Sequence, residues 1–90
     1  MSQPLLGMDV AGVRTLAALL RQRAADLRDA AALLGTLVHS VQWVGPDAEA
    51  FRSQWDGVER HRMLAVANGL EDAARRALLN AQEQELTSAR

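Results

Sequence analysis

The sequence has no cysteine, lysine, isoleucine or tyrosine, and only two of its 90 residues are proline and three are aromatic. Without cysteine, disulfide bonds, iron–sulfur clusters and thiol chemistry are excluded. Ten arginines and eleven acidic residues give a formal net charge of -1, which provides no overall attraction to nucleic acid or anionic membranes. A mass of 9.8 kDa accommodates one domain, which we expect to span residues 1–90.

Alanine and leucine dominate the composition, with 17 and 14 residues, and both favour helix. Asp9 is the expected N-cap of a heptad pattern that Arg23 interrupts once. The apolar a and d positions hold Val13, Leu20, Leu27, Leu34 and Val41, and Leu16, Ala30 and Leu37. The pattern predicts a helix over about residues 9–41, with an apolar arc of roughly 160° that one neighbouring helix cannot cover.

The strongest break in the sequence is Gly45-Pro46, which predicts a turn over about residues 42–46. Glycine suits a helix cap or a positive φ, and proline suits the first position of a new helix. Asp47 and Glu49 then fall in the first turn of that helix, where the backbone dipole favours acidic side chains.

Beyond the break, apolar residues recur mostly at steps of three and four, with one step of five after Val58. They are Ala48, Phe51, Trp55, Val58, Met63, Val66, Leu70, Ala73, Ala77 and Ala81. This spacing predicts a second amphipathic helix over about residues 47–82. Since apolar residues then become sparse, we expect residues 83–90 to form a mobile tail.

Two helices joined by a tight turn cover only part of each other, so a second chain is expected to cover the remaining apolar surface. The expected fold is all-α: an antiparallel helix-turn-helix hairpin that pairs into a dimeric four-helix bundle. The expected core and dimer-interface residues are Val13, Leu16, Leu20, Leu27, Leu34, Leu37, Val41, Val58, Val66 and Leu70. A homodimer and a heterodimer both satisfy this pattern.

Residues that would combine into a catalytic or metal site are not found in the sequence. The only histidines, His39 and His61, fall on different predicted helices, with no cysteine or lysine to act as a nucleophile. Glu59 is two residues from His61 and lies on another helix face, so a zinc site is not expected. We therefore expect no catalytic residue, no cofactor and no metal.

Binding to nucleic acid or insertion into a membrane is also not expected. Arg14, Arg21 and Arg28 share one helix face, which we interpret as a solvated flank. No apolar run has the length of a membrane span, and residues 1–8 lack the features of a signal peptide. The wide apolar arc alone suggests a further hypothesis, a membrane-active effector, which liposome leakage would test.

All three aromatic residues lie near the break. For Phe51 and Trp55 we expect packing at one end of the bundle. Trp43 lies two residues before Gly45, in a turn where side chains are often exposed. Both interpretations, packing and contact with a partner, stay open for Trp43.

These features together resemble the WXG family, the ESAT-type small proteins of type VII secretion systems. The resemblance rests on the stretch from Trp43 to Ala48, followed by Phe51 and Trp55, which is similar to the turn and early second helix of actinobacterial members. A second Trp-x-Gly begins at Trp55, but a bend there would place Pro46 inside a helix, at about 3 kcal/mol or more.

The resemblance implies a secreted substrate, or the dimer partner of one, that acts through protein–protein interaction. Such a protein folds in the cytoplasm, pairs with itself or with a sister WXG-family protein, and is exported without a cleaved signal peptide by a membrane ATPase. The turn and export motif of the family maps onto Trp43 and Gly45, with Pro46, Phe51 and Trp55 as adjacent packing residues.

One family element is missing from this sequence. Many members carry Tyr-x-x-x-Asp/Glu near the C-terminus, whereas here the residues four before Glu83 and Glu85 are Leu79 and Ala81. Either a partner supplies the element or export uses another signal. The alternative function is an intracellular helical adaptor or bundle subunit that is not exported.

Overall fold

The computed structural model describes residues 7–88. These are helical apart from residues 7–9, which precede the first helix, and residues 41–45, which connect the two long arms. The elements are α1 (Val10–Ser40), α2 (Pro46–Gln54), a π-helical segment η1 (Trp55–Glu59) and α3 (Arg60–Ser88). No strand occurs among residues 7–88, so the expected all-α class is confirmed for them.

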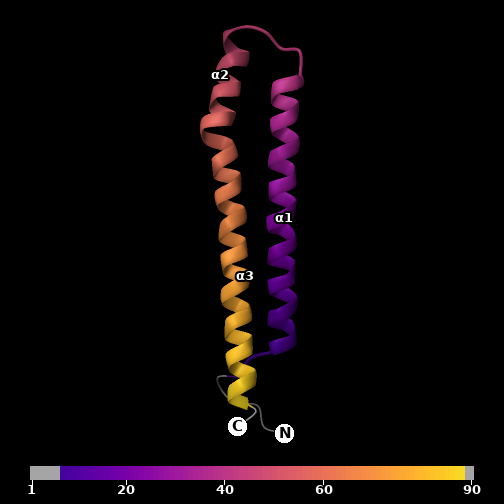
Figure 1. Ribbon diagram of the computed structural model, residues 1–90, viewed down its shortest axis with the longest axis vertical. Helices are drawn as coiled ribbons and strands as arrows, with labels where there is room; N and C mark the ends of the chain where they lie inside the picture. The colour runs from indigo at the N-terminus through magenta and orange to yellow at the C-terminus, as the bar shows by residue number, and fades with distance from the viewer. Residues whose placement is uncertain (1–6, 89–90) are drawn as a thin grey trace.

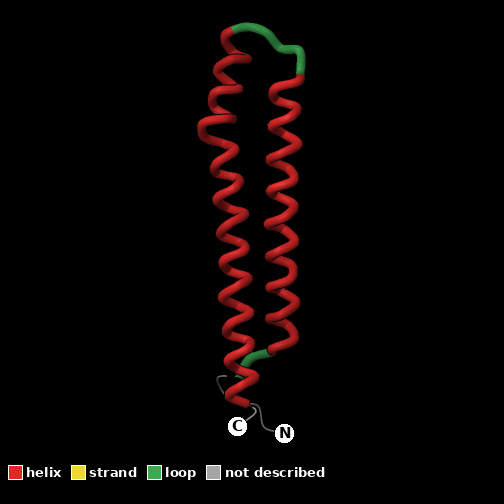
Figure 2. The backbone as a smooth tube through the Cα atoms, viewed as in Figure 1, coloured by secondary structure: helices red, strands yellow, loops and turns green. Residues whose placement is uncertain are grey.

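Two long helical arms lie side by side and run in opposite directions, as Figure 1 shows. One arm is α1, and the other is a continuous rod of α2, η1 and α3. The connection between the arms lies at one end of the molecule (Figure 2), which measures 68 × 16 × 16 Å. We call this arrangement the helix pair.

Both predicted helix starts are present. The carboxylate of Asp9 accepts a hydrogen bond from the Gly12 N–H at 3.0 Å, which caps α1. At the break, Gly45 has φ of 125°, a conformation that residues with a side chain rarely adopt, and Pro46 is the first residue of α2. Local sequence chemistry thus determines where each arm begins.

The step of five in the apolar pattern coincides with η1. In a π-helix the backbone hydrogen bonds span five residues, and here the Arg60 N–H donates to the Trp55 carbonyl. The wider turn takes up one extra residue. As a result, Val58 within η1 and Met63 after it are both half-buried instead of rotating away from α1.

Alanines form the contact between the arms. The buried alanines of α1 and α3 recur every seven positions, which is the period of a coiled-coil seam. They are Ala17, Ala24 and Ala31 in α1, and Ala67, Ala74 and Ala81 in α3. Small side chains let two helix axes approach closely. We call these six residues the alanine seam.

The ten leucines and valines expected in the core are not buried in the single chain. Half-buried are Val13, Leu20, Leu27, Val58 and Leu70, and exposed are Leu16, Leu34, Leu37, Val41 and Val66. The helix pair alone thus covers these residues in part or not at all, because the alanine column next to the predicted a and d columns faces the other arm. Their role at an interface with a second chain stays a prediction.

The C-terminal end of the second arm also differs from expectation. The sequence predicts an end near residue 82, whereas α3 continues to Ser88. Ala81 is buried against α1, and Arg14 forms an ion pair with Glu85, so contacts with α1 hold the added turns in place. Of the expected mobile tail, residues 89–90 lie outside the described residues.

The alanine seam predicts a sharp difference between neighbouring alanines. Ala24→Leu inserts three heavy atoms where the arms touch and should lower the free energy of unfolding by about 1–3 kcal/mol. Ala25→Leu makes the same change at an exposed position one residue later and should leave it nearly unchanged. Urea unfolding followed by circular dichroism measures both, and equal stabilities for the two variants would contradict the seam.

Candidate functional site

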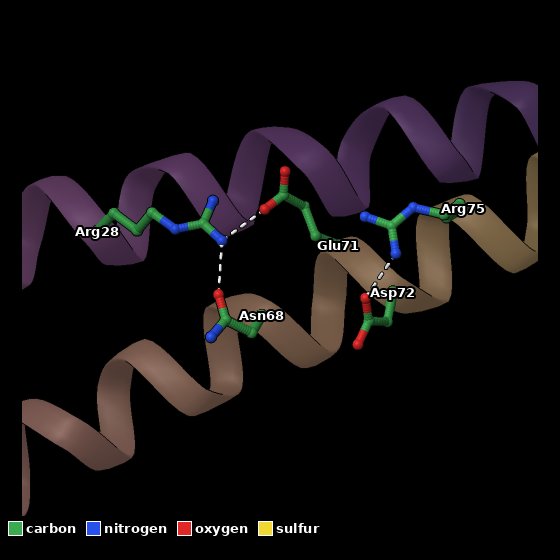
Figure 3. A network of polar contacts seen from close by, with 5 residues as sticks. All are labelled: Arg28, Asn68, Glu71, Asp72 and Arg75. Carbon is green, nitrogen blue, oxygen red and sulfur yellow. Dashed lines mark hydrogen bonds and ion pairs between the residues drawn. The ribbon is translucent and has the colours of Figure 1, made fainter.

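One face of the helix pair is polar and cross-linked by ion pairs. Arg14 pairs with Glu85, and Arg28 pairs with Glu71 at 2.5 Å and donates to the Asn68 side-chain carbonyl at 2.9 Å. Figure 3 shows Arg28 of α1 reaching across to Asn68 and Glu71 of α3. Two of the three arginines of the predicted flank are therefore paired across the arms. We call this side the ion-pair face.

The opposite face carries many of the large apolar residues of both arms. Each residue of these ion pairs lies four positions after one seam alanine of its own arm, or three positions before one. Because the arms are antiparallel, the residues that lie three positions after a seam alanine of either arm come together on the side opposite the ion pairs. They and their apolar neighbours are Val13, Leu16, Leu20, Leu27, Leu34, Leu37, Val41, Met63, Val66 and Leu70. We call this side the leucine face.

The leucine face leads into an apolar pocket at the turn. The pocket has a volume of about 360 Å³ and is lined by Leu37, Val38, Val41, Trp43 and Phe51. Trp43 is 42% exposed and Phe51 is 52% exposed, and their ring centroids lie 5.6 Å apart with a tilt of 55°. Phe51 thus packs on Trp43 rather than filling the space between the arms.

Arg52 holds the connection in its observed path. Its Nε–H donates to the carbonyl of Val38 at 2.9 Å, and a terminal N–H₂ donates to the carbonyls of Val41 and Trp43 at 3.2 and 3.0 Å. The guanidinium therefore caps the C-terminal end of α1, where a positive charge is favoured. This role could not be predicted from the sequence, because it depends on how the connection folds back over α2.

The two tryptophans lie in opposite environments. Trp55 is 7% exposed and occupies the seam next to the Gly35 backbone. Its indole Nε1–H has no hydrogen-bond acceptor among the described residues. The second Trp-x-Gly therefore lies within a helical arm with its tryptophan buried, whereas Trp43 of the first lies in the connection.

Polar groups at the turn end lie on the ion-pair side. His39 pairs with Asp56 at 2.8 Å, beside an open polar pocket of about 550 Å³ lined by Glu49, Arg52, Ser53, Asp56 and Gly57. His61 is exposed on the second arm. In the described part of the chain, no group of three or more His, Asp or Glu side chains is arranged to hold a metal ion.

Length and hydrophobicity together decide whether a helix can cross a bilayer. Across residues 7–88, no helix combines the length and the hydrophobicity that a membrane span requires. Exposed apolar side chains occur on the leucine face and at the pocket, and also elsewhere on the helix pair, at Leu19, Leu33, Leu79 and Leu86.

The capping role of Arg52 predicts a measurable loss. Arg52→Ala removes three charge-assisted hydrogen bonds, and we expect the free energy of unfolding to fall by about 1–2 kcal/mol. Arg75→Ala is the matched control, since Arg75 makes one exposed pair with Asp72 at 2.8 Å, which contributes about a few tenths of a kcal/mol. Chemical denaturation compares the two, and equal losses would contradict the cap.

No family model matches this chain, and no curated protein or solved structure matches it. Its function must therefore be inferred from its residues and their geometry. The two candidate binding surfaces are the leucine face and the pocket beside Trp43, both of which expose large apolar side chains.

Proposed function

We propose that this chain is a secreted substrate of a type VII secretion system, or the dimer partner of one, and that it acts by binding other proteins rather than by catalysis. The observation that carries the proposal is the position of Trp43-Val44-Gly45 in the connection between two long antiparallel arms. That is where the WXG family, which the sequence resembles, has its signature. The second Trp-x-Gly does not match the position of this signature, since Trp55 is buried within an arm.

The leucine face supports the pairing part of the proposal. The chain exposes 6802 Å², against about 5,200 Å² for a compact monomer of its mass. The excess is about twice the 800 Å² that each partner contributes to a standard protein interface. A second helix pair on the leucine face would complete a four-helix bundle and bury the half-covered leucines of both chains.

The pocket at the turn supports contact with a further partner. Trp43, Phe51 and Val41 are large apolar side chains left exposed at the tip of the helix pair. Exposed tryptophan beside an apolar pocket is typical of residues that contribute strongly to binding. We propose this tip as the surface that meets the secretion machinery, whose membrane ATPase is the expected partner.

Secretion is tested in an actinobacterial host that carries a type VII system, with a co-expressed sister chain. We expect the chain in the culture filtrate of the parent strain and its absence from the filtrate of a strain without the system's ATPase. Trp43→Ala should reduce export, whereas Val44→Ala, at the neighbouring and 95% exposed position, should not.

Retention of the chain inside the cell in both strains would overturn the secretion proposal. If Trp43→Ala also left every phenotype unchanged, and the chain formed a stable complex with a cytoplasmic protein, the alternative of an intracellular adaptor would take its place. Unimpaired export without the ATPase would likewise contradict the proposed route.

A further inference from the structure

One ion pair lies at the edge of the leucine face. Arg23 occupies the same helical column as Leu16, Ala30 and Leu37, and it pairs with Asp26 at 2.9 Å. The side chains of Arg23 and Asp26 are 62% and 49% exposed, so neither is enclosed by its own chain. A charged pair among apolar side chains needs a compensating environment once a partner covers the face.

The carboxylate of the pair is kept ionised. Hydrogen bonds from Gln22 and from Arg23 lower the pKa of Asp26 below its ordinary value. At neutral pH the pair therefore presents one full negative and one full positive charge, on residues three positions apart, to anything that docks on α1.

The pair is centred on α1. The helix runs from Val10 to Ser40, so its midpoint is residue 25, between Arg23 and Asp26. Apolar residues extend from this point in both directions, with Leu20, Leu16 and Val13 on one side and Leu27, Leu34 and Leu37 on the other. A twofold axis through the middle of α1 would therefore match apolar residues with apolar residues on both sides.

Two helix pairs that meet face to face with their turns at opposite ends place α1 against α1 and α3 against α3. With the midpoints aligned, Arg23 of each copy lies opposite Asp26 of the other, and two positive charges meet two negative ones. The α3 helices meet at the same level through the small side chains of Ala73 and Ala77, which permits close approach.

We infer that the occupant of the leucine face is a second copy of this chain, antiparallel to the first, and that Arg23 and Asp26 set its register by forming reciprocal ion pairs across the twofold axis. The inference rests on the proposed function, which requires a second chain on this face. Beyond that function, it identifies the second chain as a further copy of this one and Arg23 and Asp26 as the residues that select it. A single polar site within an apolar interface is known to specify register and orientation.

The opposite orientation distributes the charges differently. If both turns lay at the same end, α1 would meet α3 of the second copy. The pairs Arg14–Glu85 and Arg28–Glu71 place Arg76 level with Arg23. Arg23 of one copy would then lie level with Arg76 of the other, so that like charges would meet where the antiparallel arrangement brings Arg23 opposite Asp26.

Mixing of charge-reversed variants tests the inference. Arg23→Asp makes the site of one copy entirely negative, and Asp26→Arg makes the other entirely positive, so each variant alone should dimerise poorly. Mixed, the two should pair with each other, and native mass spectrometry should show the ratio of mixed to unmixed dimers raised about tenfold or more over random pairing.

Matched controls come from the same chain. Arg75 and Asp72 form an equally spaced ion pair on α3 away from the leucine face, so Arg75→Asp mixed with Asp72→Arg should pair at random. A single chain carrying both Arg23→Asp and Asp26→Arg restores the balanced set and should dimerise like the parent. Circular dichroism verifies that each variant is folded.

Random pairing of the folded Arg23→Asp and Asp26→Arg variants would overturn the inference, since the charges would not meet. A folded parent chain that stays monomeric, and dimerises only with a sister chain, would overturn it as well. In both cases the proposed function would survive, because its own test is ATPase-dependent export.

Discussion

The close contact of two helical arms through alanine is the constraint on which the rest of the structure depends. Ala24 and its counterparts on α3 are fully buried where the arms meet, and many of the larger apolar side chains lie to one side of the seam. The charged residues that bridge the arms lie on the other side, as Arg28 and Glu71 do (Figure 3). The seam thereby produces a helix pair with two chemically different faces. The leucine face is a direct consequence of how the chain packs on itself.

The turn end adapts this packing to larger residues. Trp55 takes the seam position beside Gly35, and η1 absorbs the extra residue that would otherwise rotate the rest of the arm out of register. Arg52 ties the end of α1 to the connection and so keeps Trp43 against Phe51. The apolar pocket that results is continuous with the leucine face through Leu37 and Val41. A partner on the face and a partner at the tip would therefore contact adjoining surfaces.

Features that depend on neighbouring residues could be predicted from the sequence. The cap at Asp9, the break at Gly45 and the helical class follow from local chemistry and are present. The choice of the seam could not be predicted from one heptad pattern, because alanine and leucine columns lie side by side and only the matching alanines of the second arm select between them. The cap by Arg52 and the extension of α3 to Ser88 depend on contacts between the arms. The role of Trp43 in export stays a prediction.

The central claim is that the leucine face is covered by a second chain, and light scattering tests it most directly. At micromolar concentration the purified chain should have about twice the 9.8 kDa monomer mass. Leu34→Asp, at a position on the leucine face that is 40% exposed, should reduce the mass to that of the monomer. Leu79→Asp, at a 53% exposed position outside that face, should leave the mass doubled. A helical, monodisperse monomer of the parent chain, or equal masses for the two variants, would contradict the account.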